Sequence, residues 1–336
     1  MQAEDQQAQP AALPADQEWV LPKRPGVAGN LWKFIRRKPL GAFGLLVVLV
    51  MISMTLGTPK AEFGAPELPS RPLGFELSSP WLARYDAEKT FKSVDENDIE
   101  RIDRYHKPSA DHWLGTDKGG RDTYSRVVFA ARRSLFIGLW ALAFATIVGT
   151  TVGVISAYFG GWSDTLIQRL MDSFQAFPAL LILILLISLR PPSLTVLAIG
   201  LGFVGVTSVQ RIVRGVVLST REQPYVEAAR VVGATDLRTM VYHILPNIMA
   251  PIIVVFSIGL GSVILAEAAI SFIAANRVPQ DPSWGIMLNQ TREFLPPEAE
   301  GYHTLAAGGA IILAVLGFNL AGDALRDVLD PRLRVG

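Results

Sequence analysis

Few residues of this chain could do chemistry. It has 336 residues, half of them hydrophobic, a net charge of +1 and no cysteine. The lack of cysteine excludes disulfides, thiolate metal ligands and cysteine nucleophiles. His112, His243 and His303 are too scattered to predict a metal site, and the glycine-rich run GTDKGG, 115–120, lacks the lysine and Ser/Thr of a phosphate-binding loop. We therefore expect no catalytic residue, no metal site and no ATP hydrolysis in this chain.

Glu267 is the one residue whose surroundings call for an explanation. It is the only charged residue within the apolar stretches that we predict to span a membrane. An unpaired carboxylate is costly in hydrocarbon, so Glu267 should face a bundle interior or a water-filled path, or be neutralised. Two roles stay open: a residue of a translocation path or gate, and a structural carboxylate bonded to Ser271 or to nearby backbone.

Six apolar stretches indicate the elements that would position such a residue. A bilayer core about 30 Å thick needs about 20 helical residues. The predicted spans are Leu40–Gly57, Ser134–Tyr158, Phe174–Leu189, Leu194–Val209, Asn247–Ala275 and Thr304–Gly322. The third and fourth should form a tight hairpin, and the proline-containing segment Asn276–His303 should be a structured cap rather than a helix. The predicted fold class is an all-α polytopic membrane protein with six transmembrane helices.

Basic residues set the predicted orientation. Those before the first span are Lys23, Arg24, Lys33, Arg36, Arg37 and Lys38. By the positive-inside rule they place the N terminus in the cytoplasm, and six crossings return the C terminus there. The predicted division is a tail (1–39), a first helix (40–57), an extracytoplasmic segment (58–133), a five-helix core (134–322) and a cytoplasmic tail (323–336). The near-neutral charge gives no sign of a nucleic-acid partner.

Two smaller patterns concern the second span. A charged cluster lies just outside it: Arg121, Asp122, Arg126, Arg132 and Arg133. Pairing within the cluster, or anchoring to lipid headgroups, is favoured over contact with an arriving protein. Within the span, Gly149 and Gly153 form a small-xxx-small pair, which predicts close helix packing.

A polar loop, 221–246, separates the fourth and fifth spans. Pro224 suits the first turn of a helix, and Gly233 can end that helix in the left-handed conformation. Thr235 can then cap a second helix. At helical spacing, one face of that helix carries Leu237, Met240, Val241, Ile244 and Leu245. This apolar face needs a partner, which is either the chain's own bundle or another protein.

The loop resembles the EAA loop of ABC importer permeases. The matching residues are Glu227, Ala228, Ala229, Gly233, Ile244, Leu245 and Pro246. Three further blocks resemble the "C"-type subunit of the dipeptide/oligopeptide/nickel branch: HWLGTDKGGRDTYSRVVFAARRSLFIG from His112, LAEAAISFIAANRVPQDPSWGIML from Leu265 and LGFNLAGDALRDVLDPRLR from Leu316. Trp113 stands where proline is usual, Ala130 replaces glycine, and Ile273–Asn276 replaces Leu-Gly-Leu-Gly. These departures lie on the outer side, so they bear on the cargo rather than on the mechanism.

The resemblance implies a non-catalytic permease subunit of an ATP-driven importer, with the type I permease fold, in a prokaryotic inner membrane. The implied partners are a second permease, two ATPases that hold ATP and Mg, an extracytoplasmic binding protein and membrane lipid. Coupling to the ATPases would fall on Glu227, Ala228, Ala229, Gly233, Leu237, Met240, Val241, Leu245 and Pro246. The implied cargo is a di- or oligopeptide, with a nickel chelate or an oligosaccharide as alternatives. A secondary transporter is less favoured, because it would need several intramembrane carboxylates.

Cysteine labelling tests the predicted orientation, since the chain has no cysteine of its own. Ser93→Cys is expected to react with a membrane-impermeant maleimide in intact cells, whereas Thr235→Cys should react only after permeabilisation. The parent chain controls for background labelling. Reaction of Thr235→Cys in intact cells would overturn the orientation.

Overall fold

The computed structural model describes residues 36, 38–56, 82–94, 100–278, 281–291 and 301–329. The chain divides after Arg37 into two units, and the architecture below is that of the second unit, 38–336. The predicted N-terminal tail lies almost wholly outside the described residues. So do 58–81 and 95–99 of the predicted extracytoplasmic segment.

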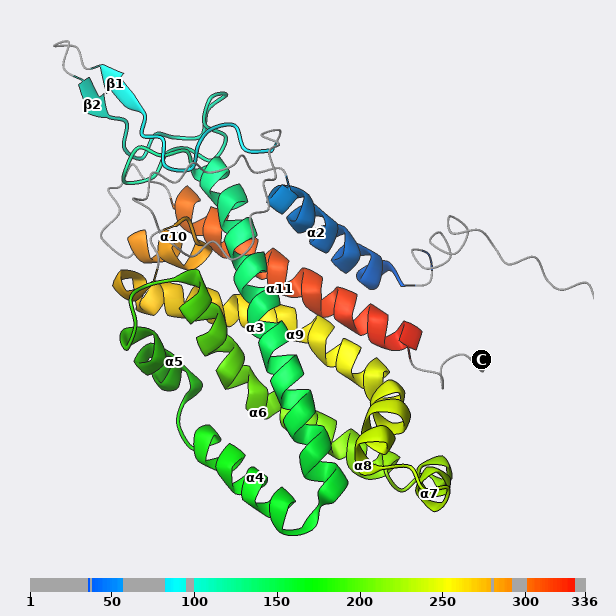
Figure 1. Cartoon of the computed structure of the whole chain (residues 1–336). Coiled ribbons are helices and arrows are strands. Elements are labelled where there is room, and N and C mark those ends of the chain that lie inside the picture. The colour runs from blue at the N-terminus through cyan, green and yellow to red at the C-terminus, as the bar shows by residue number, and fades with distance from the viewer. Residues whose placement is uncertain are drawn as a thin grey trace, which may run out of the picture. The chain divides into compact units, whose positions relative to one another are not determined.

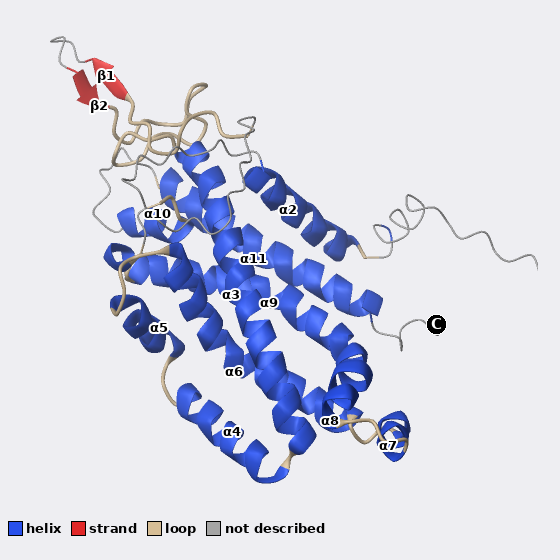
Figure 2. Ribbon diagram, viewed as in Figure 1, coloured by secondary structure: helices blue, strands red, loops and turns tan. Residues whose placement is uncertain are grey.

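Nearly every regular element of this unit is a helix (Figure 1, Figure 2). The apolar helices are α2 (Pro39–Leu56), α3 (Thr123–Phe159), α5 (Ala179–Ser188), α6 (Leu194–Thr220), α9 (Leu245–Ile273) and α11 (Tyr302–Leu329). In the described part of the chain, α3, α6, α9 with the helical turns before it, and α11 are long and apolar enough to cross a bilayer. Helix α4 (Gly161–Gln175) and α5 form a pair bent by 83°, and α2 is a shorter apolar helix. The all-α membrane fold is confirmed, and the six predicted crossings are compatible with these helices.

Two glycines let α3 lie directly against α6. A Cβ atom on Gly149 would stand 2.8 Å from the Cβ of Val209, and one on Gly153 would stand 2.9 Å from the carbonyl oxygen of Gln210. Both distances are shorter than real Cβ atoms tolerate, so the two backbones approach as closely as glycine permits. The close packing predicted from the Gly149/Gly153 pair is confirmed.

A second close contact joins α2 to α11. A Cβ atom on Gly44 would lie 2.6 Å from the backbone nitrogen of Ala321, and one on Gly317 would meet the side chain of Val47. Lys38, just before α2, forms an ion pair with Asp327 near the end of α11. The first and last helices of the second unit, α2 and α11, therefore lie side by side.

Several predicted boundaries are wrong for identifiable reasons. Helix α3 begins at Thr123 rather than Ser134, because the Asp122 carboxylate accepts the N–H of Ser125 at 2.8 Å and caps the helix. Helix α6 runs on to Thr220, beyond Val209. These two helices extend past the apolar stretch because their polar ends are stabilised by caps and side-chain pairs, which a hydropathy pattern does not contain.

Three further predictions need correction. The third span is broken before Pro178, whose missing N–H cannot continue the α4 ladder. The cap segment contains a helix after all, α10 (Trp284–Gln290), which begins at the Ser283 side-chain cap and follows a short 3₁₀ turn at Ala275–Arg277. Helix α11 continues past Gly322 to Leu329, so the predicted C-terminal tail starts inside a helix.

The segment before α3 carries two short antiparallel strands, β1 (Lys92–Val94) and β2 (Glu100–Ile102). Two arginines of the charged cluster pair with carboxylates outside it: Asp117 forms ion pairs with Arg126 and Arg121, and Arg121 also pairs with Glu88 at 2.7 Å. Burial alone would raise the pKa of Asp117, but these guanidinium groups and two backbone N–H donors outweigh it and lower the pKa. Arg121 and Arg126 are thus neutralised by the chain's own carboxylates, while pairing among the cluster's own members and anchoring to lipid stay predictions.

The α3–α6 contact can be tested with matched glycine substitutions. Gly149→Ala is expected to lower the Tm of the purified protein, because overpacking of a close helix contact typically costs about 1–3 kcal/mol. Gly215→Ala is the control: Gly215 also lies inside a helix, but a Cβ there meets nothing within 4 Å. The control should leave Tm unchanged or raise it. Equal Tm values for the two variants would contradict the close contact.

Candidate functional site

The loop between α6 and α9 folds as two helical arms, here called the hairpin (residues 224–246). The first arm is α7 (Pro224–Val231), with its proline in the first turn as predicted. Gly233 has φ +90°, and its N–H donates to the carbonyl of Arg230 at 2.9 Å. Thr235 then caps the second arm by accepting the N–H of Arg238 at 3.4 Å. The predicted helix, glycine turn and cap are all present.

The second arm is not a regular α-helix. A short helix, α8 (Asp236–Arg238), leads into a π-helix, η1 (Thr239–Ile244), which continues directly into α9. In it the N–H of Leu245 donates to the carbonyl of Met240, five residues back. Pro246 cannot donate an N–H, and the side chain of Asn247 instead donates to the His243 carbonyl at 2.6 Å. Because a π turn holds more residues than an α turn, the residues after it lie at different angles around the helix axis than they would in an unbroken α-helix.

The five side chains of the predicted apolar face are buried to different degrees. Ile244 is fully buried, whereas Leu237 is 68% exposed and Val241 is also exposed. Met240 and Leu245 are half-buried. That all five side chains share one face stays a prediction; it assumed 3.6 residues per turn, whereas Thr239–Ile244 is a π-helix.

The inward side of the hairpin packs on the chain's own bundle. Val226 and Ile244 have no exposed surface, and they join a cluster with Tyr158 of α3 and with Val213 and Val217 of α6. The sequence left two partners open for the apolar face of the hairpin: the chain's own bundle or another protein. The contacts of Val226 and Ile244 show that the bundle covers the inward side of the hairpin.

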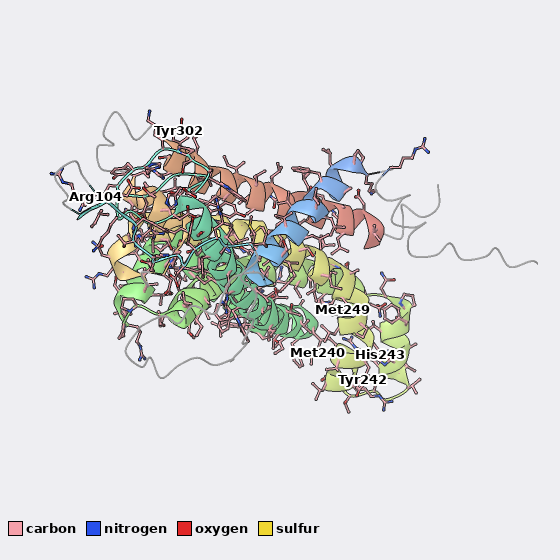
Figure 3. The ribbon with its side chains drawn as sticks, turned by 90° about the horizontal axis from the view of Figure 1, so that it is seen from above. Arg104, Met240, Tyr242, His243, Met249 and Tyr302 are labelled. Carbon is pink, nitrogen blue, oxygen red and sulfur yellow. The ribbon has the colours of Figure 1, made fainter. Side chains whose placement is uncertain are left out.

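The other side of the hairpin exposes large apolar side chains. These are Val231 (81% exposed), Val232 (88%), Leu237 (68%) and Tyr242 (71%). Figure 3 shows Met240, Tyr242 and His243 together, far from Arg104 and Tyr302. Only Leu237 of these four was predicted. Val231 and Val232 flank the glycine turn, and Tyr242 lies in the π-helix, so helical spacing alone did not find them.

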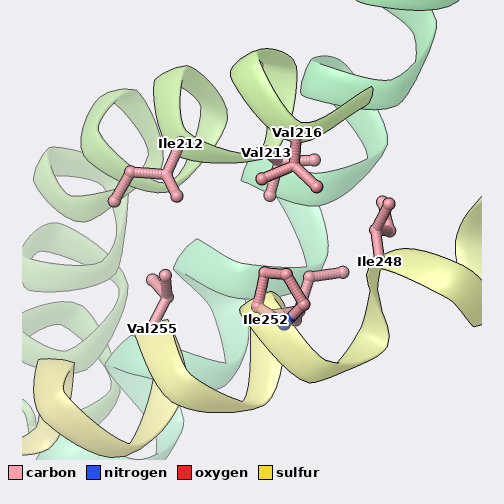
Figure 4. Close-up of a pocket in the computed structure, with 7 residues that line it drawn as sticks. Ile212, Val213, Val216, Ile248, Ile252 and Val255 are labelled. Carbon is pink, nitrogen blue, oxygen red and sulfur yellow. The ribbon is translucent and has the colours of Figure 1, made fainter. Parts of the chain in front are cut away.

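The remaining predicted coupling residues fall on different sides of the hairpin. Glu227 and Ala228 are exposed on α7, and Gly233 and Pro246 are exposed at its turn and at its root, whereas Ala229 is half-buried. Their predicted part in coupling stays a prediction. Just beyond the root, α6 and α9 leave a small apolar pocket (Figure 4). It is lined by Ile212, Val213, Val216, Ile248, Pro251, Ile252 and Val255.

Glu267 is fully buried at the other end of α9. Its carboxylate accepts hydrogen bonds from the hydroxyls of Ser271 at 2.8 Å, Ser283 at 3.0 Å and Ser134 at 3.1 Å. The guanidinium of Arg133 lies 3.7 Å away and also donates to the Asp281 carbonyl at 2.6 Å. The carboxylate thus connects α9, the start of α10 and α3, and the predicted bond to Ser271 is confirmed. A part in the translocation path stays a prediction.

Comparison with known proteins agrees with this geometry. Residues 149–335 match the family model described as binding-protein-dependent transport system inner membrane component. A dipeptide transport system permease of Alkalihalophilus pseudofirmus is 42% identical over 69% of this chain and 75% of its own length. A glutathione transport system permease of Escherichia coli is 36% identical over 91% of this chain and 90% of its own, and one of Pectobacterium atrosepticum is 36% identical over 76% and 81%.

The contacts of Glu267 generate a stability prediction. Glu267→Ala should lower the yield and the Tm of the protein, because removing one member of a buried ion pair costs about 3–5 kcal/mol. Ser283→Ala, which removes one hydroxyl donor, should cost about 1 kcal/mol. The double variant Glu267→Leu/Arg133→Met should be more stable than Glu267→Ala, since it leaves no unpaired charge.

Uptake separates the two roles of Glu267. A variant with normal yield and Tm but defective uptake would favour the translocation path. Normal uptake together with normal Tm in Glu267→Ala would exclude both roles.

Proposed function

The chain belongs to the family of binding-protein-dependent transport system inner membrane components, and from that premise we propose how it works in an ATP-driven peptide importer. It is a multi-pass permease subunit of the ABC importer type, a family whose permeases are not themselves catalytic. We assign it a peptide cargo, because dipeptide and glutathione permeases are among its relatives. A nickel chelate or an oligosaccharide remains the alternative cargo.

The exposed side of the hairpin carries the proposal. Val231, Val232, Leu237 and Tyr242 are large apolar side chains in a segment whose inward side is already packed. Several exposed apolar groups within one short segment favour an interaction surface, and burying each one fully stabilises a complex by up to about 1.5–3 kcal/mol. We propose that an ATPase subunit covers this surface. ATP and Mg would be held by two such ATPases and not by this chain.

The connection of the hairpin to the bundle suggests how the work is passed on. The π-helix η1 runs into α9 without a break, so movement of the hairpin must turn or displace α9. Closure of the ATPases on ATP would then rock the helices against those of a second permease, and the cargo would arrive on an extracytoplasmic binding protein. This is a rigid-body switch biased by a ligand on another chain. It requires the hairpin and both termini to lie on the cytoplasmic side.

A self-contained secondary transporter is the competing class. Such a protein needs charged groups at membrane depth to couple an ion gradient. Glu267 is the single carboxylate in the predicted spans, and its oxygens already accept three hydroxyl hydrogen bonds. Purification distinguishes the two classes, because an importer permease should bring two ATPases and a second permease with it.

The exposed surface gives the direct test. With the whole complex co-expressed, Leu237→Asp should keep the second permease but retain at least about tenfold less ATPase, because a carboxylate would replace a buried apolar contact. The matched control is Val328→Asp, at an exposed apolar position at the far end of α11. Wild-type ATPase content and cargo uptake in Leu237→Asp would show that this surface is not the ATPase contact.

A further inference from the structure

One tyrosine of α3 contacts both arms of the hairpin. The hydroxyl of Tyr158 donates to the carboxylate of Asp236, the first residue of α8, at 2.7 Å. The guanidinium of Arg230, on α7, lies 4.9 Å from the centroid of the same ring. Tyr158 is buried, so its ring and hydroxyl are held in one place. A single side chain thereby fixes the separation of the two arms from the end of α3.

The two residues before Tyr158 bind other elements. The hydroxyl of Ser156 is hydrogen-bonded to the carboxylate of Asp164 on α4. The same carboxylate accepts two hydrogen bonds from Arg214 on α6, from Nε at 2.7 Å and from Nη2 at 2.5 Å. The carbonyl of Ala157 accepts a hydrogen bond from Arg221 at 2.5 Å. Three consecutive residues therefore connect α3 to α4, to the end of α6 and to the hairpin.

These contacts matter because α3 has no covalent link to the hairpin. Helices α6 and α9 continue into it through the chain, but α3 meets it only through side chains. The apolar contacts of Val226 and Ile244 are non-directional and permit sliding. The Tyr158–Asp236 hydrogen bond has a charged acceptor and a defined direction, so it resists sliding.

We propose that Tyr158 is the positioning residue that makes α3, and through Ser156 and Asp164 also α4, follow the hairpin during the transport cycle. This inference rests on the proposed function, since it deepens the coupling step. Tyr158 touches neither nucleotide nor cargo. Its loss would let the hairpin move without carrying α3, so ATP would be hydrolysed with less cargo moved.

Tyr158→Phe tests this role in the intact complex in proteoliposomes. The variant keeps the ring, its packing and the Arg230 contact, but it removes the hydrogen-bond donor. We expect cargo uptake per ATP hydrolysed to fall by about tenfold, the population shift that one charge-assisted hydrogen bond allows. A merely structural role would lower complex yield and leave this ratio unchanged. A wild-type ratio in Tyr158→Phe would overturn the proposal.

Two companions sharpen the test. Tyr124→Phe is the control, because it removes a hydroxyl at the opposite end of α3. The ring of Tyr124 packs on that of Trp113, and the variant keeps this contact. It should therefore keep the wild-type ratio of cargo uptake to ATP hydrolysed. Asp236→Ala should match Tyr158→Phe, and the double variant should be no worse than either, because all three break one interaction. Additive losses would mean that the two residues act separately.

A distance measurement on the permease itself separates this inference from the proposed function. Spin labels on Thr165→Cys of α4 and Arg238→Cys of the hairpin report their separation by pulsed electron resonance. Tyr158→Phe should broaden that distance distribution, whereas Tyr124→Phe should not. An unchanged distribution in Tyr158→Phe would contradict the positioning role, even if ATP-driven uptake were established. Broadening without any ATP-driven uptake in the wild type would leave the linkage standing and remove the proposed function.

Discussion

The close approach of α3 to α6 is the constraint on which the other features of this permease depend. Without side chains at Gly149 and Gly153, the two backbones lie in direct contact through the middle of the bundle. Because α3 is a single helix of 37 residues, the contact at Gly149 and Gly153 also fixes the residues before and after it. Ser134, in the first half of α3, lies against Glu267, and Tyr158, near its last residue, lies against Asp236. A bulkier α3–α6 contact would displace both at once.

The regions of α3 beside Glu267 and beside the hairpin hold charge in different ways. Beside Glu267, a fully buried carboxylate is surrounded by hydroxyl donors and a guanidinium, and loss of the carboxylate would leave the buried Arg133 without its charge partner. At the Tyr158 end, the ion pairs of Asp164 with Arg214 and of Asp172 with Arg211 are partly exposed. Water can replace a broken pair there at low cost. Charge is therefore buried beside Glu267 and partly exposed to solvent beside the hairpin.

Much of this structure could be predicted from the sequence, wherever the signal is local. Apolar runs located the membrane helices, and Pro224, Gly233 and Thr235 marked the hairpin, because each residue type favours its backbone conformation irrespective of the fold. What could not be predicted depends on distant partners or on a change of helical period. Ser134 and Glu267 are 133 residues apart, and Tyr158 and Asp236 are 78 apart. The π-helix at Thr239–Ile244 has no residue signature comparable to a cap, so a prediction made with α-helical spacing could not include it.

The π-helix also bears on how such a permease could diversify. A π turn holds one residue more than an α turn, so deleting a single residue between Thr239 and Ile244 would restore an ordinary helix. Each residue of an α-helix turns the chain by about 100°, and such a deletion would rotate the exposed hairpin surface relative to α9 by about that angle. Such a rotation would break the packing of Val226 and Ile244 on the bundle and the Tyr158–Asp236 hydrogen bond, so the π turn fixes the one orientation of the hairpin that these contacts allow. In evolutionary terms, the length of this short segment is constrained by contacts that lie outside it, on α3 and α6.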